Sequence, residues 1–189
     1  MSIQFDKVQP KTKEQLKQLI NYAFKHDIYD LNFIDTSKIT DMSLLFSNCI
    51  HNFDVSSWDV SNVVNMYCTF DHCKNFIGKG LENWNVSNVI SMTSMFAGCE
   101  KFDCGLSNWD VSNVTNMNHM FYDCENFNCD LSNWDVSNVK AMLWMFSGCK
   151  DFKGKGLENW DVSKVKDMNY MFNNCDKITI PKWYKKYNF

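Results

Sequence analysis

The sequence predicts an α/β solenoid, in which short coils of chain stack side by side along one axis. Three observations lead to this fold class. The line WDVSNVTNMNHMF at residues 109–121 returns almost unchanged as WDVSNVKAMLWMF at residues 134–146. Apolar residues recur at fixed offsets within each copy, so each copy has an apolar side that only its neighbours can cover. The tryptophan that opens the line recurs in steps of 26, 25, 25 and 26 residues, at Trp58, Trp84, Trp109, Trp134 and Trp160.

We number the positions of a coil from this tryptophan, which is position 0. Val or Ile stands at +5, Met at +8, usually Met at +11, Phe at +12 and Cys at +15. A degenerate first copy, FIDTSKITDMSLLFSNC, puts Ile34 at position 0, so six copies cover residues 33–178. A period of roughly 20 to 29 residues, with apolar residues at fixed positions in each copy, is typical of leucine-rich repeats. We therefore expect a leucine-rich-repeat-like stack.

The N-terminal residues, 1–32, are predicted to form a cap that consists of a helix and a lead-in strand. An uncapped end would expose the core and the strand edge. Thr12 and Gln15 make a capping box that starts the helix. Apolar residues then follow at helical spacing, at Leu16, Leu19, Ile20, Ala23 and Phe24.

Each coil is expected to hold one short parallel strand and one helical turn. In LSNWDVSNV the apolar residues Leu106, Trp109 and Val111 partly alternate, which favours a strand. In VTNMNHMFYDC the apolar residues are three and four apart, which favours a short helix or a 3₁₀ turn. Residues 179–189 break the repeat and are predicted to form the C-terminal cap, closed by Trp183 and Tyr184.

Charge and hydropathy exclude several classes of partner. The net charge is −3, and all 19 cationic residues are Lys, so a nucleic-acid-binding surface is not expected. No run of 18 apolar residues occurs, so no membrane span is expected. The opening MSIQFDKVQPKTKEQ lacks the apolar region of a signal peptide, which predicts a cytoplasmic protein. The cell surface is the alternative, if export follows a route that the sequence does not show.

The repeated line also resembles a known family. The motif set LSNWDVSNVTNMNHMFYDC, with its MF-x-x-C-x-x-F tail, is similar to the BspA-type leucine-rich repeat surface proteins of mycoplasmas, anaerobic bacteria and protists. The resemblance covers about three quarters of the chain. It implies a leucine-rich-repeat fold and, for the better-known members, binding or adhesion at a cell surface.

Nine cysteines raise the question of metal binding and disulfides. Zinc sites need close pairs such as C-x-x-C, which this chain lacks, so buried free thiols are expected instead. Cys104 and Cys129 share a position one coil apart, where a disulfide is geometrically allowed, but in a reducing compartment both should remain thiols. The other column, at +15, should form an inward ladder of Cys49, Cys73, Cys99, Cys124, Cys149 and Cys175.

Acidic and amide residues also form columns. A row of carboxylates at +1 could bind calcium, but Asn85 interrupts it and the spacing is that of no familiar calcium loop. The alternative is structural: Asp at +1 and Ser at +3 would accept backbone N–H bonds in a turn, and Asn at +4 would form a side-chain amide ladder. The acidic column is Asp35, Asp59, Asp110, Asp135 and Asp161.

No catalytic motif is found, and we expect neither an enzyme nor a cofactor. The four histidines, His26, His51, His72 and His119, lie in unrelated contexts, and no phosphate loop, nucleophile elbow or H-E-x-x-H occurs.

The columns whose residue type varies from coil to coil are predicted to form the partner-binding surface. Position +10 reads Leu44, Cys68, Ser94, His119, Trp144 and Tyr170, and position +9 varies as well. Exposed aromatic residues often anchor protein partners, although Trp144 and Tyr170 could simply pack on each other. The candidate partner-binding residues are His119, Trp144, Tyr170, Asn118, Leu143 and Asn169.

These observations favour a non-catalytic repeat scaffold that binds another protein through its variable columns. The alternative is a surface-exposed structural or adhesion protein. The identity of the partner does not follow from the sequence. Two chains could also pair through exposed edges of the solenoid.

Overall fold

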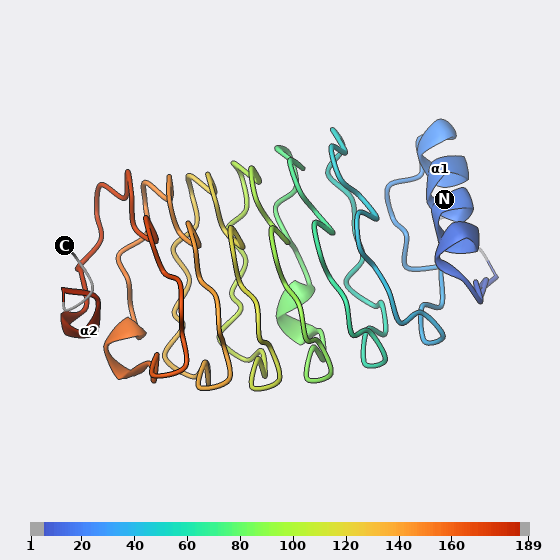
Figure 1. The fold of residues 1–189 in the computed structure, drawn as a ribbon. Helices are drawn as coiled ribbons and strands as arrows, with labels where there is room; N and C mark the ends of the chain where they lie inside the picture. Colours follow the sequence, from blue (N-terminus) through green and yellow to red (C-terminus); the bar gives the residue numbers. More distant parts are fainter. Residues whose placement is uncertain (1–5, 186–189) are drawn as a thin grey trace.

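The computed structural model describes residues 6–185, and the chain winds through successive coils that stand side by side between two terminal helices (Figure 1). The elements in chain order are helix α1 (Lys13–Lys25), the 3₁₀ helices η1 (Leu81–Asn83) and η2 (Leu157–Asn159), and helix α2 (Lys182–Lys185). The outer parts of the two predicted caps, residues 1–5 and 186–189, lie outside the described residues. Within the described part, no helix is long and apolar enough to cross a membrane.

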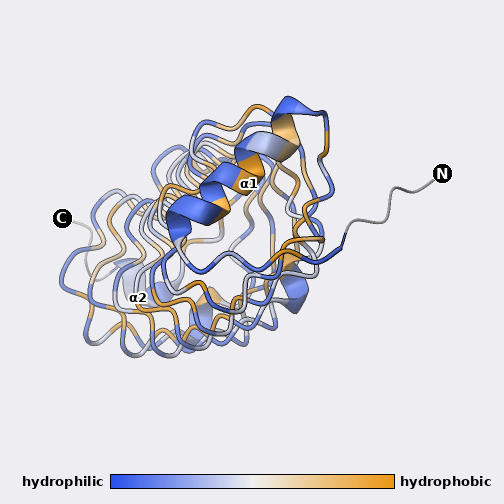
Figure 2. Cartoon of the chain, turned by 90° about the vertical axis from the view of Figure 1, so that its right-hand side faces the viewer, coloured by the Kyte–Doolittle hydropathy of each residue, from blue (hydrophilic) through white to orange (hydrophobic). Residues whose placement is uncertain are grey.

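Helix α1 covers the N-terminal end of the stack and begins where the capping box predicts (Figure 2). The hydroxyl of Thr12 accepts a hydrogen bond from the N–H of Gln15 at 3.3 Å, and the Gln15 side chain accepts one from the N–H of Lys11. Its apolar face packs into the core, with Leu16, Ile20 and Ala23 buried. The structure thus has a helix at residues 13–25 with this N-cap and this buried face.

Neighbouring coils pair through the segment from position +7 to position +14. The N–H groups at +8, +10, +12 and +14 donate to the carbonyls at +7, +9, +11 and +13 of the next coil, at 2.6–3.1 Å. In this way His119 donates to Leu143 and Phe121 donates to Met145. From +8 to +14 each coil therefore presents donors toward the C-terminal end of the stack and acceptors toward the N-terminal end, whereas at +6 the N–H donates to the preceding coil, as Thr115 does to Ile90. Parallel bridges join the +7 residues Asp41, Asn65, Ser91, Asn116, Ala141 and Asp167.

The paired segment differs from the expected strand. A strand was predicted in LSNWDVSNV and a helical turn in VTNMNHMFYDC, yet the +7 bridges lie in the second segment, and η1 and η2 lie directly before Trp84 and Trp160. In the described residues every bridge is isolated. The physical reason is that residues at +10 and +14 have left-handed backbone angles, which turn the chain where a strand would continue.

Two coils carry GKGLEN before the tryptophan, and their glycines are required by the geometry. The residues that precede η1 and η2, Gly80 and Gly156, have φ angles of 89° and 94°. A Cβ atom on Gly80 would lie 2.1 Å from the Cβ of Ser56 in the preceding coil. Glycine is thus needed both for its φ angle and for the close approach of the coils.

Aromatic rings run through the core as a continuous column. The phenylalanines at +12 stack coil on coil with ring centroids 5.4–5.8 Å apart, at Phe46, Phe70, Phe96, Phe121, Phe146 and Phe172. The position-0 tryptophans are buried beside them and donate their indole N–H to a carbonyl of the preceding coil, as Trp109 does to Leu81 at 2.7 Å. Both contacts join neighbouring coils, so each coil depends on the next for its stability.

The C-terminal cap continues part of this pattern. Trp183 stacks on Trp160 with centroids 6.5 Å apart, and its indole N–H donates to Leu157 at 2.7 Å, so it occupies the next tryptophan position. Tyr184 is buried and meets the ring of Phe172 edge-on at 4.9 Å. Trp183 and Tyr184 therefore close the core as the sequence predicts.

Candidate protein-interaction surface

The variable column at +10 has an unusual backbone conformation in every coil. Its six residues have φ angles between 52° and 57°, and none of them is glycine. A side chain with a Cβ atom costs roughly 1 to 2 kcal/mol in this left-handed region. The conformation follows from the coil, which needs the N–H at +10 to face the next coil. The backbone thus fixes the position of each +10 side chain and leaves its type free.

Four aromatic side chains of the last three coils lie in contact, and we call them the aromatic row: His119, Tyr122, Trp144 and Tyr170. Trp144 stacks on Tyr170 with centroids 4.7 Å apart. Tyr122 meets Trp144 edge-on at 6.1 Å and His119 edge-on at 5.9 Å, which links the row across coils. Tyr170 remains 59% exposed although it is stacked, so the contact with Trp144 does not remove its ring from solvent.

The sequence analysis missed Tyr122, which completes the row. It lies at +13, and that column also varies from coil to coil, reading Ser47, Asp71, Ala97, Tyr122, Ser147 and Asn173. Variability at +13 was the signal that could have identified it.

The predicted neighbours at +9 have different environments. The side chain of Asn118 accepts the N–H of Leu143 at 2.8 Å, so it helps to join two coils. Leu143 is half-buried, and its carbonyl accepts the N–H of His119. Asn169 is exposed, and its amide donates to Asp167 at 2.9 Å. Of these three residues, Asn169 is the most accessible to a partner.

The surroundings of two residues of the aromatic row, His119 and Tyr122, favour their uncharged forms. Partial burial lowers the pKa of His119, which favours the neutral imidazole. The negative charge of Asp123, followed by burial, raises the pKa of Tyr122, which favours the neutral phenol. A neutral aromatic surface suits an apolar or aromatic partner better than an ionic one.

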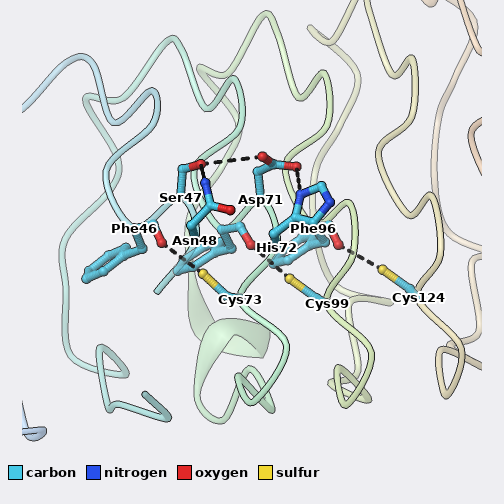
Figure 3. Close-up of polar contacts among 10 residues, drawn as sticks. Phe46, Ser47, Asn48, Asp71, His72, Cys73, Phe96, Cys99 and Cys124 are labelled. Carbon is cyan, nitrogen blue, oxygen red and sulfur yellow. Dashed lines mark hydrogen bonds and ion pairs between the residues drawn. The ribbon is translucent and has the colours of Figure 1, made fainter. Parts of the chain in front are cut away.

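The cysteine column at +15 is a ladder of free thiols that points inward (Figure 3). Each thiol from the second coil onward donates to the carbonyl of the +12 phenylalanine one coil earlier, as Cys99 does to Phe70 and Cys124 does to Phe96, both at 2.9 Å. Burial raises the pKa of the Cys73 thiol to about 12 and holds that of Cys124 well above its usual value. These thiols therefore act as buried hydrogen-bond donors and are poor nucleophiles.

Cys104 and Cys129 are also free thiols. The Cys104 Sγ contacts a carboxylate oxygen of Glu82 at 3.2 Å, and the Cys129 Sγ accepts the N–H of Leu106 at 2.9 Å. Burial raises the pKa of Cys104 to about 12, with Glu82 adding to the shift.

A serine of the first coil meets an aspartate and a histidine of the second coil at the surface (Figure 3). The ring of His72 contacts a carboxylate oxygen of Asp71 at 2.9 Å, and the hydroxyl of Ser47 reaches the other oxygen at 3.4 Å. In a catalytic triad the hydroxyl is hydrogen-bonded to the imidazole, which removes its proton. Here the hydroxyl contacts the carboxylate instead, so this cluster does not have the geometry of an activated nucleophile.

The acidic column forms turns, as the structural alternative predicted. Each carboxylate at +1 accepts the N–H of the serine two residues on, as Asp110 does from Ser112 at 3.0 Å. The column at +4 differs from the expected amide ladder, because Asn113 donates to the main-chain carbonyl of Ser87 in the preceding coil at 2.8 Å. In the described part of the chain, no group of three or more His, Cys, Asp or Glu residues is arranged to hold a metal ion.

Comparison with known proteins gives one match. A family model described as "Mycoplasma protein of unknown function, DUF285" matches residues 14–79 and 66–183, which together include all six coils. No curated protein and no solved structure matches the chain. Since the two matched ranges span 14–183 of the 189 residues, the chain belongs to the family of Mycoplasma proteins of unknown function, DUF285.

Proposed function

We propose that the protein is a non-catalytic repeat scaffold that binds another protein through the aromatic row. The observation that carries this proposal is the contact between Trp144 and Tyr170, in which two large rings from adjacent coils form a surface that stays partly open to solvent. Trp and Tyr are the residues most often found as binding anchors, because a large rigid ring loses little conformational entropy on binding.

The regular positions support the same assignment. The +12 rings, the +15 thiols and the +1 carboxylates each make the same contact in coil after coil, so the stack needs them. The +10 side chain makes no such shared contact, and its type changes from Leu44 to Tyr170. A residue type that stacking does not require is free to be selected by a partner.

The proposal includes the fold class and the family type. We assign the stack to the leucine-rich-repeat-like solenoids of the BspA type, since coils with a period near 25 residues bury their apolar sides against each other. The expected location is the cytoplasm. The alternative, a structural or adhesion protein at the cell surface, follows from the resemblance to the BspA-type proteins.

A capture experiment tests the binding surface. The intact tagged protein, the double variant Trp144→Ala/Tyr170→Ala and a control variant Tyr67→Ala are compared as baits in a lysate of the source cell. Tyr67 is a matched control because it is an exposed tyrosine, 43% accessible, on the second coil and outside the aromatic row. We expect a protein retained by wild type and Tyr67→Ala and lost with the double variant. Equal retention by all three baits would contradict the role of the row.

Cell fractionation separates the two locations. A cytoplasmic scaffold is recovered in the soluble fraction and is protected from protease added to intact cells. A surface protein is degraded by that protease while a cytoplasmic marker survives.

A further inference from the structure

From +8 to +14 alternate backbone N–H groups of each coil point toward the next coil, and those of the last coil meet no further coil within residues 6–185. In the first five coils the N–H groups at +8, +10, +12 and +14 all find carbonyls in the next coil; in the fifth coil, Met142, Trp144, Phe146 and Gly148 donate to residues 167–173. In the sixth coil the equivalent donors have no acceptor within residues 6–185: Met168, Tyr170, Phe172 and Asn174. Within residues 6–185, the C-terminal face therefore carries a row of four N–H donors without backbone acceptors.

A concavity lies over these donors. It has a volume of about 640 Å³ and is lined by residues 165–170, Phe172 and Asn173 of the sixth coil together with Ile180 and Tyr184 of the cap. The cap supplies the tryptophan position of a seventh coil through Trp183. The concavity therefore lies where the paired segment of that seventh coil would stand.

Lysines outnumber carboxylates around the concavity. Lys166 and Asp167 line it, and Lys182 and Lys185 lie in the adjacent helix α2. None of these three ammonium groups pairs with a carboxylate among residues 6–185. The unpaired N–H dipoles add to this potential, so the site favours a segment that presents carbonyl oxygens and acidic flanking side chains.

We propose that this concavity binds an extended polypeptide segment of a partner protein, which pairs with residues 168–174 as the paired segment of a seventh coil. The segment gives alternate backbone carbonyls to the four N–H donors, the mode known as β-augmentation. Its apolar side chains enter the concavity in the order Met, x, x, Met, Phe, because those are the types that stand at +8, +11 and +12 in the coils.

A second copy of the chain fits this face less well. From +8 to +14 its own C-terminal face presents donors, which do not pair with donors. The carbonyls of its first coil, at Asp41, Ser43, Leu45 and Ser47, face the end of the stack that α1 covers. A partner segment with exposed backbone carbonyls can pair with these donors, because no helix covers its carbonyls. This end site shares Tyr170 with the aromatic row but differs from it in mode of binding, since its binding energy comes from the backbone and from the cap.

The test uses a peptide with the sequence of residues 89–98, VISMTSMFAG, and the full-length chain labelled with ¹⁵N. In the third coil this sequence already supplies carbonyls, at Ser91, Thr93, Met95 and Ala97, to the N–H groups of the second coil. Amide hydrogen exchange is measured with and without the peptide. We expect the amides of Met168, Tyr170, Phe172 and Asn174 to exchange fast in the free chain and at least tenfold more slowly with saturating peptide.

The amides one coil earlier, at Met142, Trp144, Phe146 and Gly148, are the internal control and should stay protected throughout. A scrambled peptide of the same composition should slow none of the eight. A variant that fills the concavity, Ile180→Trp, should weaken peptide binding at least tenfold, whereas Ile90→Trp, at an isoleucine that is 51% exposed on the third coil, should not.

Three results would overturn the proposal. The first is unchanged exchange at the four edge amides when the peptide is saturating. This measurement uses the wild-type chain, so it does not depend on whether Ile180→Trp folds. The second is slower exchange at Tyr170 alone, with Met168, Phe172 and Asn174 unchanged. The third is a free chain that sediments as a dimer with the four amides already protected, because the occupant would then be a second copy.

Discussion

The ring of Trp144 stacks on the ring of Tyr170 at 4.7 Å, and both residues have left-handed backbone angles, with φ of 57° and 55°. Neither ring belongs to the core columns, which run through Phe146 and Phe172 two residues further along the chain. A buried stack, Phe146 on Phe172, and a partly exposed stack, Trp144 on Tyr170, therefore both join the fifth and sixth coils. The separate roles of these two stacks can be tested by mutation.

The exposed stack should matter for binding and little for stability. The double variant Trp144→Ala/Tyr170→Ala should weaken partner binding by at least about 2 kcal/mol, as loss of aromatic anchors commonly does. Its free energy of unfolding should change much less than that of Phe121→Ala. A binding titration beside a denaturant melt measures both. If the double variant binds normally and melts as early as Phe121→Ala, the two rings are core residues and the partner binds elsewhere.

The buried stack should matter for stability. Phe121 is fully buried, with the rings of Phe96 and Phe146 at 5.7 and 5.6 Å and that of Phe127 at 4.1 Å. Phe121→Ala should cost about 3 to 5 kcal/mol of unfolding free energy, because the rigid neighbouring coils cannot collapse into the cavity. Denaturant unfolding measures the loss, with Tyr67→Ala as the exposed control. An unchanged midpoint would show that Phe121 is not a core residue.

The left-handed +10 positions predict an unusual order of substitutions. Leu44 has a φ of 57° and is 46% exposed, so its side chain contributes little packing. Leu44→Gly should be more stable than Leu44→Ala by about 1 kcal/mol, because alanine keeps the Cβ that strains this conformation. At an ordinary position the order is reversed. Thermal or denaturant melts of the two variants decide the sign.

The thiol ladder predicts low reactivity in the folded state. Seven of the nine cysteines are buried, and Cys49 and Cys175 are half-buried. Titration with a thiol reagent should count far fewer fast-reacting groups in the native protein than in denaturant, with Cys49 and Cys175 reacting first. Equal counts in both conditions would rule out a buried ladder. Mass spectrometry after brief labelling identifies which residues have reacted.

The same thiols predict a loss of stability at alkaline pH. The folded-state pKa of Cys73 is raised to about 12 by burial, whereas the ordinary value is 9.0. Above the ordinary pKa the unfolded chain binds fewer protons than the folded chain, so the free energy of unfolding falls as pH rises, from about pH 9 upward. Denaturant midpoints measured from about pH 7 to about pH 10.5 follow this change.

Cys73→Ala is the control for this pH dependence. The substitution leaves a cavity whose cost does not depend on pH, and it removes one raised pKa. Its stability should therefore decline less steeply with pH than that of wild type. Equal slopes would show that Cys73 does not contribute to the alkaline loss.

The sequence by itself determined the elements that rest on short-range rules and strict repetition. Thr12 and Gln15 fixed the start of α1, because a capping box uses only local hydrogen bonds. The repeated Asp and Ser fixed the turns, since an Asx turn closes over two residues, as in Asp110 and Ser112. The recurrence of Phe121 and Cys124 at one position in every coil marked them as buried.

The tertiary structure alone decided which segment pairs between coils. The apolar spacing of VTNMNHMFYDC is equally compatible with a helical turn and with the observed ladder, because both bury the same side chains. Only the neighbouring coil, which supplies the carbonyl of Leu143 to the N–H of His119, makes the left-handed angle at His119 favourable. No local pattern encodes that angle, since the residue types at +10 share nothing that would favour it.

The same cause explains what the sequence missed at the two candidate surfaces. Tyr122 joins the aromatic row because the coil places +13 of one coil beside +10 of the next, a distance that depends on how the coils stack. The donors of Met168 and Tyr170 are unpaired because the described chain has no further coil to meet them. Backbone direction along a stack is a property of successive coils together, so the tertiary structure decides it and a single repeat does not.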